Sequence, residues 1–318
     1  MSVFLIANEA ANAGRAAGLI SAARAALEQV GGAQLLLTKT RGDEARCAQE
    51  AITHGATAVA VLGGDGTISR VACELVRAKS SIPLAVFGAG TGNDFAKSLA
   101  APIHDFRAMA DLISVNRVRT IDAGIIDNTI FINSAGFGFD ADIVAKSLET
   151  GRLQGKAKYA ATAITELFQY RGFEAGILSA ELLTTSKTPR SVVISEFHTH
   201  SFSPNPARRL FARWLTIVFA NGKFFGGAFR IAPAASLEDG LLDAVFVRDA
   251  APWRRAAIFA RALGGNHVRE PEVGIGRNSR WSIEFSEPPV YQADGELWQA
   301  TSATVDVAVL PAALRLVG

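Results

Sequence analysis

The ten residues AVAVLGGDGT, numbered 58 to 67, decide the fold of this chain. The apolar run from Ala58 to Leu62 has the length of a buried parallel strand. The residues from Ile68 to Ala78 then follow helical spacing. Between them lies a turn made of Gly63, Gly64, Asp65, Gly66 and Thr67. Glycines allow backbone N–H groups to approach an anion, and a helix N-terminus adds partial positive charge at the same point. The pattern predicts a phosphate-binding turn, and the aspartate within it indicates a divalent cation or a proton nearby.

A second glycine-rich turn follows the next apolar run. Residues 83–87 read PLAVF, and residues 88–95 read GAGTGNDF. In a doubly wound sheet the carboxyl ends of neighbouring strands face one crevice, so we expect both turns to contact one ligand. Gly90 belongs to this turn, and Thr91 and Asn93 offer a hydroxyl and an amide to ribose or phosphate oxygens. Neither turn completes the P-loop or the G-x-G-x-x-G pattern, which argues against a dinucleotide dehydrogenase.

The composition limits the class of protein. A chain of 318 residues that is 49% hydrophobic is long enough for two domains with their own cores. Its net charge of +2 gives no polybasic surface, so we expect no nucleic-acid partner. Cys47 and Cys73 form no C-x-x-C motif, and no apolar run is long enough for a membrane-spanning helix. These features favour a cytoplasmic protein.

The hydrophobic pattern changes near Arg119. Before it, strands and helices alternate, which is typical of a doubly wound, Rossmann-like α/β domain, here expected over residues 1–120. After it, β-rich runs at 120–126 and 129–134 are joined by the turn Asp127-Asn128, and a helical region follows at 143–170. From Ala175 onward the chain is mostly strands, with one helix from Trp253 to Leu263. We therefore expect an antiparallel β-sandwich domain with helices over residues 121–304.

The two glycine-rich turns, in this order, resemble the diacylglycerol kinase catalytic-domain family. That family includes the soluble bacterial diacylglycerol kinases, the lipid kinases of the YegS/BmrU type, and the sphingosine and ceramide kinases. The GGDGT element alone is shared with NAD kinases and phosphofructokinases, whereas the pair is specific. The resemblance implies that residues 305–318 return to the first domain and that Asn8 and Thr38, at the ends of two predicted strands, contact the nucleotide. It also implies a transient contact with a membrane surface, for which the helical region 143–170 is a candidate.

Two acidic motifs in the second domain gain a meaning from the same resemblance. By sequence alone, Asp239-Gly240 and Asp294-Gly295-Glu296 could simply close hairpins. The family implies a structural Mg²⁺ held by Asp239 and the carbonyl groups of Ser236 and Leu241. It further implies that Asp294 and Glu296 face Asp65 across an interdomain cleft and supply the catalytic base. An extended segment would put Asp294 and Glu296 on one face, so the pattern does not choose between them.

The resulting hypothesis is an ATP- and Mg²⁺-dependent kinase that phosphorylates a free hydroxyl of a membrane-derived, diacylglycerol-like lipid. One departure from the family stands beside the phosphate-binding turn: the usual Asn-Glu is replaced by Ser69-Arg70. Two alternatives stay open. One is an NAD kinase-like enzyme, which shares the GGDGT element, and the other is a non-catalytic lipid or nucleotide sensor on the same fold, which this departure suggests. The sequence also leaves the identity of the lipid and the oligomeric state open, with a homodimer among the options.

Overall fold

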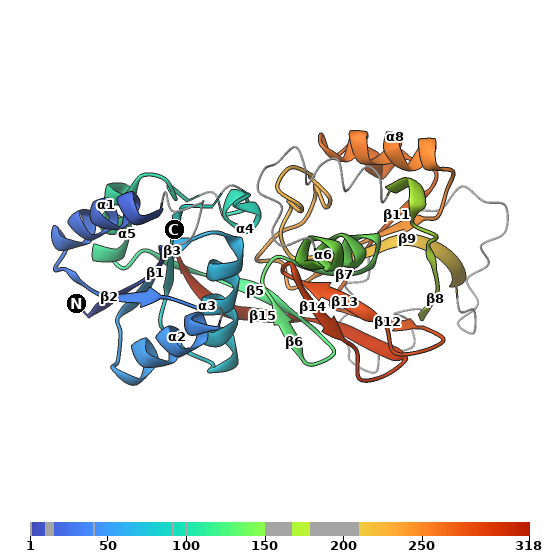
Figure 1. Cartoon of the computed structure of the whole chain (residues 1–318). Coiled ribbons are helices and arrows are strands. Elements are labelled where there is room, and N and C mark those ends of the chain that lie inside the picture. Colours follow the sequence, from blue (N-terminus) through green and yellow to red (C-terminus); the bar gives the residue numbers. More distant parts are fainter. Residues whose placement is uncertain are drawn as a thin grey trace.

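The computed structural model of the chain describes residues 2–9, 16–40, 42–90, 92–99, 101–149, 167–178 and 210–318. Two lobes lie side by side, an α/β domain at the N-terminal end and a β-rich domain (Figure 1). The expected fold class, a Rossmann-like domain followed by a β-sandwich, is confirmed.

The first domain is built on a parallel sheet with the strand order β4-β3-β1-β2. Its strands are β1 (Val3–Asn8), β2 (Ala33–Thr38), β3 (Ala58–Gly63) and β4 (Leu84–Gly88). Its helices are α1 (Ala16–Glu28), α2 (Asp43–Thr53), α3 (Asp65–Arg77), the short α4 (Asp94–Lys97) and α5 (Phe106–Ser114). The sequence pattern had not indicated α5, whereas β3, α3 and β4 lie close to the positions that the pattern predicted.

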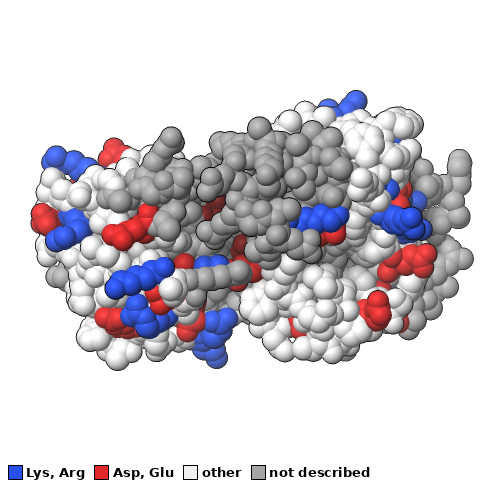
Figure 2. All heavy atoms as spheres, viewed as in Figure 1, with Lys and Arg blue, Asp and Glu red and all other residues white. Residues whose placement is uncertain are grey.

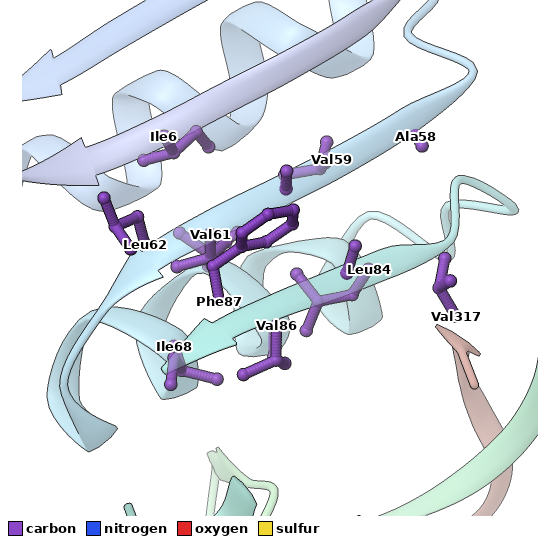
Figure 3. Packing of buried hydrophobic residues seen from close by; sticks show 14 of the residues in the cluster. Ile6, Ala58, Val59, Val61, Leu62, Ile68, Leu84, Val86, Phe87 and Val317 are labelled. Atoms are coloured by element: carbon purple, nitrogen blue, oxygen red, sulfur yellow. The ribbon is translucent and has the colours of Figure 1, made fainter. Parts of the chain in front are cut away.

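The core of this domain explains why residues 58–67 control it. Every residue of β3 is buried, because the strand lies between β1 and β4 in the sheet and is packed against α1 and α3. The apolar face of α3 covers the sheet, with Ile68 beside Val86 of β4 (Figure 3). Burial of these side chains fixes the end of β3 and the start of α3, and therefore the turn between them.

A long antiparallel pair of strands connects the two domains. Strand β5 (Val118–Ile126) pairs with β15 (Thr304–Val317) from Val118 opposite Val317 to Ile126 opposite Val307, with one irregularity. At its far end β15 reaches the first domain, where Leu316 pairs with Leu84 of β4. Figure 1 shows this ribbon running between the lobes, and Figure 3 shows Val317 near Leu84.

The second domain consists mainly of antiparallel strands around an aromatic-rich core. Its strands are β6 (Thr129–Phe131), β7 (Ser134–Gly138), β8 (Phe173–Leu178), β9 (Leu210–Ala220), β10 (Leu242–Arg248), β11 (Val273–Asn278), β12 (Arg280–Glu284), β13 (Val290–Ala293) and β14 (Glu296–Gln299). A second cluster of buried residues joins the sheet to α6 (Phe139–Glu149) and α8 (Pro252–Ala262). The short helix η3 (Asn266–Arg269) follows α8.

The predicted hairpin at Asp127-Asn128 is present, with Asp127 at φ 51° between β5 and β6. The helical region expected from Ile143 to Tyr170 begins earlier, at Phe139, because β7 ends at Gly138 and the chain turns directly into α6. Residues 150–166 of that expected region lie outside the described part, so its suggested contact with a membrane stays a prediction.

None of the helices in the described ranges combines the length and the apolar character that crossing a bilayer requires. On the face shown in Figure 2, acidic and basic side chains of the described residues are interspersed. This distribution agrees with the nearly balanced charge of the sequence.

Candidate active site

The turn between β3 and α3 presents the start of a helix to a cavity between the domains. Gly64 is the N-cap of α3 and provides no side-chain cap for the first N–H groups of the helix. A Cβ added at Gly66 would meet no atom within 4 Å, so the space beside the second helical residue is open. Uncapped N–H groups beside open space form a suitable cradle for a phosphate group.

The second glycine-rich turn packs directly on the first. The Ala89 N–H donates to the Gly63 carbonyl at 3.0 Å, and a Cβ on Gly90 would come within 2.7 Å of the Gly64 Cα. Asn93 is buried in the left-handed region at φ 53°, and its Oδ1 has no hydrogen-bond partner in the described part of the chain. A buried acceptor of this kind is suited to a ligand donor. Thr91 lies outside the described residues.

Asp65 stands at the junction of the two turns. Its Oδ1 accepts a hydrogen bond from the Phe95 N–H at 3.3 Å. Burial, and secondarily the neighbouring Asp94 carboxylate, raises the pKa of Asp65 to about 6. A bound cation or a proton would offset the unfavourable free energy of this buried negative charge. This agrees with the interpretation that the aspartate of the turn lies near a cation or a proton.

Asp94 of α4 connects the two domains. Its carboxylate accepts from the Gly227 N–H at 2.7 Å and pairs with Lys97 at 3.2 Å, while Lys97 donates to the Gly227 carbonyl. Beside them, the Ser98 hydroxyl accepts from the Lys223 N–H at 3.0 Å. Helix α4 is therefore bound to the 223–227 loop of the second domain.

Two other residues expected to contact the nucleotide, Asn8 and Thr38, lie at the ends of β1 and β2. The Asn8 side-chain amide donates to the Thr67 hydroxyl at 3.2 Å, which ties the turn to the end of β1. The Thr38 hydroxyl is buried and donates to the Ala7 carbonyl at 3.4 Å. In this structure these side chains bond to the protein, and their contact with a nucleotide stays a prediction.

The Asp294 carboxylate enters the cavity from the hairpin between β13 and β14. Three backbone N–H groups, those of Ile132, Asn133 and Ser134, donate to it at 2.8 to 3.0 Å. The Ser69 hydroxyl of α3 donates at 2.5 Å. Burial raises the pKa of Asp294, and these hydrogen bonds act in the opposite direction.

Glu296 points to a different partner. Two nitrogens of the Arg70 guanidinium, Nε at 2.7 Å and the second terminal nitrogen, donate to one Glu296 oxygen. The expectation that Asp294 and Glu296 share a face of an extended segment is wrong. Asp294 occupies a turn at φ 48°, followed by Gly295 at φ 80°, so the two side chains diverge.

Both Asp65 and Asp294 line one cavity of about 940 Å³ between the domains. Its polar end includes Ser69 and Asp94, and its second-domain walls are largely apolar, with Phe139, Ile143, Val218, Ile231 and Phe259 among them. Residues 65 and 294 are far apart in the sequence and meet here only because the domains pack together.

One buried acid of this cavity was not identified from the sequence. Asp140, in the first turn of α6, accepts from the Thr216 hydroxyl and the Gln292 amide, each at 3.0 Å. Burial raises its pKa to about 6. Gln292 also accepts from the Gly295 N–H at 3.0 Å, so Asp140 is connected to the acidic hairpin. The sequence signal was Asp140 directly after an aromatic and glycine-rich strand end.

The loop expected to hold a structural Mg²⁺ contains a different cation. Asp239 pairs with the Arg277 guanidinium at 2.5 Å, and its other oxygen accepts from the Leu241 N–H at 3.1 Å. Within the described ranges, no group of three or more His, Cys, Asp or Glu side chains is arranged to hold a metal ion. The residues of this loop do not fit the expected ion, because a positive group already contacts the one carboxylate ligand.

Comparison with known proteins gives matches over nearly the whole chain. Residues 2–126 match the model of the diacylglycerol kinase catalytic domain, and residues 133–318 match that of the YegS C-terminal NAD kinase beta sandwich-like domain. A "Probable lipid kinase YegS-like" of Klebsiella pneumoniae (strain 342) is 30% identical, with 88% of this chain and 84% of that protein covered. A diacylglycerol kinase of Bacillus subtilis (strain 168) is 29% identical over 81% of this chain and 77% of its own.

The same fold occurs in a solved structure. A crystal structure of a diacylglycerol kinase from Bacillus anthracis str. Sterne superimposes with a TM-score of 0.70 at 18% identity, covering 99% of this chain and 96% of that one. At this identity the likeness concerns the fold alone.

Proposed function

Because this chain belongs to the family that joins a diacylglycerol kinase catalytic domain to a YegS-type C-terminal domain, we propose that it transfers the γ-phosphoryl group of ATP to a hydroxyl group of a lipid. The observation that carries the proposal is the interdomain cavity. It combines the phosphate-binding turn, represented by Asp65, and the Asp294 carboxylate with walls that are largely apolar. Apolar walls of this kind can bury the hydrocarbon chains of a lipid acceptor, which removes apolar surface from water.

The nucleotide phosphates would lie against Gly63–Thr67, with the uncapped start of α3 as their main donor group. Gly90 and Asn93 would border the nucleoside, where the unpartnered Asn93 Oδ1 can accept from it. Asp65 would supply one oxygen to a Mg²⁺ ion, in keeping with the preference of this ion for few carboxylates beside nucleotide phosphates. Such an ion neutralises charge on the phosphates during transfer.

The lipid acceptor would extend its chain along the apolar walls and direct its hydroxyl toward the polar end. Phe139, Ile143 and Phe259 supply apolar contact, and the buried Asp140 carboxyl is available to a polar head group. Because a bilayer contains such acceptors, the enzyme would contact a membrane surface transiently from the cytoplasm.

Asp294 is the better candidate for the base that takes the proton from the acceptor hydroxyl. It lines the cavity, whereas Glu296 is engaged by Arg70. Burial raises the pKa of Asp294, and a raised pKa makes a carboxylate a stronger base at neutral pH. In this structure the Ser69 hydroxyl donates to Asp294 Oδ2, and an acceptor hydroxyl would donate to the same oxygen in its place. Glu296 would hold the hairpin through Arg70.

The direct test is transfer of radiolabelled phosphate from γ-labelled ATP to lipids presented in mixed micelles. The panel contains diacylglycerol, monoacylglycerol, phosphatidylglycerol, a sphingoid base and a polyprenol. Asp294→Asn should lower turnover on the active lipid by at least about a hundredfold and leave ATP affinity within a few-fold.

A matched control is Asp127→Asn. Asp127 also occupies a hairpin turn at positive φ and accepts hydrogen bonds, from Thr301, but it does not line the cavity. Its turnover should stay near that of the wild type. A folded Asp294→Asn protein with undiminished turnover would exclude Asp294 as the base. Binding of ATP and Mg²⁺ without phosphorylation of any lipid would favour the sensor alternative, and phosphorylation of NAD would favour the NAD kinase alternative.

A further inference from the structure

We infer that the Arg277 guanidinium takes the position of a structural cation in the 234–243 loop, so that this part of the fold needs no divalent ion. Arg277 contacts three oxygens. It lies 2.5 Å from Asp239 Oδ2 and 3.2 Å from Asp243 Oδ2, and it donates weakly to the Ala234 carbonyl at 3.5 Å. The inference concerns the stability of the second domain and is independent of the proposed kinase activity.

The sheet fixes Arg277 in this position. Strands β10 and β11 are antiparallel, and their register puts Arg277 directly opposite Asp243. Directly opposed residues on neighbouring strands have their side chains on the same face. Asp239 then enters from the turn before β10, where Gly240 adopts φ 71° and its N–H donates to Asp122 of β5 at 2.7 Å. Both partners of the guanidinium are therefore held by backbone structure.

The chemistry of the contacts is that of a cation site. Two carboxylates and one carbonyl form an oxygen-only set, which is also what a hard divalent ion prefers. The Asp243 side chain is only 3% exposed, and a buried carboxylate needs a positive partner. Arg277 supplies this charge permanently, because a guanidinium stays protonated at every pH of interest.

The same contacts disfavour a divalent ion on Asp239. An ion that bound the Asp239 carboxylate would stand next to the positive charge of Arg277, and like charges at this distance repel each other. To admit the ion, the guanidinium would have to leave the Asp239 carboxylate. The protein thus contains its own replacement for the ion.

The test is thermal unfolding of the nucleotide-free full chain after chelation, with and without added MgCl₂ at constant ionic strength. The wild type should show no Mg²⁺-dependent rise in Tm. Arg277→Gln should lower Tm by about 5 °C, because it leaves the buried Asp243 carboxylate unpaired. Arg277→Lys keeps the positive charge and provides a milder variant if Arg277→Gln does not fold; it should be equally insensitive to Mg²⁺.

Arg280→Gln is the matched control, since Arg280 pairs with Asp306 at 2.9 Å on the exposed surface nearby. It should change Tm by no more than about 1–2 °C. Two results would overturn the inference. One is a saturable rise of the wild-type Tm with Mg²⁺ that Asp239→Asn abolishes. The other is a loss of stability in Arg277→Gln no larger than that in Arg280→Gln.

Discussion

The Arg70 guanidinium on α3 of the first domain donates to the Glu296 carboxylate on β14 of the second. On its other side it contacts Glu44 of α2 at 3.1 Å, and the Glu44 side chain is only 2% exposed. One arginine thus neutralises a buried acid within its own domain and an acid of the neighbouring domain. The glutamate that the family usually carries at this position would add a third negative charge beside Glu44 and Glu296. Arg70 instead supplies a positive charge that pairs with both acids.

Arg70→Ala should lower the free energy of unfolding by about 3–5 kcal/mol, because it leaves the buried Glu44 carboxylate without its cation. Arg77→Ala, on the same helix, removes an exposed pair with Glu74 and should cost no more than about 1 kcal/mol. Denaturant titration measures both values. Adding Glu44→Gln to Arg70→Ala should restore part of the loss, and equal losses in the two single variants would contradict this account.

Gly66→Val should fold and lose ATP affinity by more than about tenfold, since its side chain would extend into the open space beside the start of α3. Gly18→Val in α1 is the control, because a Cβ there also meets no atom within 4 Å. Calorimetric titration with ATP and Mg²⁺ reports the affinity. Unchanged affinity in a folded Gly66→Val protein would mean that this turn is purely structural.

The stability of the chain should depend on pH through Asp65. Its folded pKa is raised to about 6, so folding favours the protonated acid. The resulting stabilisation is fully present below the unfolded pKa of about 4 and is lost as pH rises through about 6. Asp65→Asn has no such titration. Its free energy of unfolding should therefore rise relative to the wild type between about pH 4 and about pH 7.

Urea unfolding of the nucleotide-free protein across this range measures the effect. Asp111→Asn, which changes an exposed aspartate of α5, is the control. A difference between Asp65→Asn and wild type that stays constant with pH would show that Asp65 does not titrate in this window.

Leu263→Gln should raise the apparent KM for the lipid about fivefold and leave the KM for ATP unchanged, because Leu263 lines the cavity at its apolar side. The side chain is 55% exposed, so stability should hardly change. Val115→Gln alters an aliphatic residue that is 70% exposed and does not line the cavity, and should leave both KM values as they are. Equal lipid KM values in the two variants would argue against lipid binding at this wall.

The local parts of the site follow from the sequence, and the contacts between domains do not. An apolar run that ends in Gly63-Gly64 and continues as an amphipathic helix permits few structures, and the turn lies where it was expected. Asp294 could be identified as an acid of interest. Its conformation could not, because three N–H donors from residues 132–134 hold it in a turn.

Arg70 illustrates the same limit. Nothing in the residues next to Arg70 indicates Glu296, which lies 226 positions further along the chain. Likewise, Arg277 meets Asp243 only through the register of β10 and β11. Long-range ion pairs depend on the assembled sheet, so a sequence pattern can suggest the charges but not their partners.

The ribbon of β5 and β15 also bears on how the chain is made. In the first domain, Leu84 of β4 pairs with Leu316. Strand β5 pairs over only three residues with β6, and its long partner is β15, from residues 307–317. On the ribosome, residues 2–126 therefore emerge with one sheet edge and one strand still unpaired, a state in which exposed strand edges can join other chains. The N-terminal domain completes its sheet only after nearly the entire second domain has been synthesised.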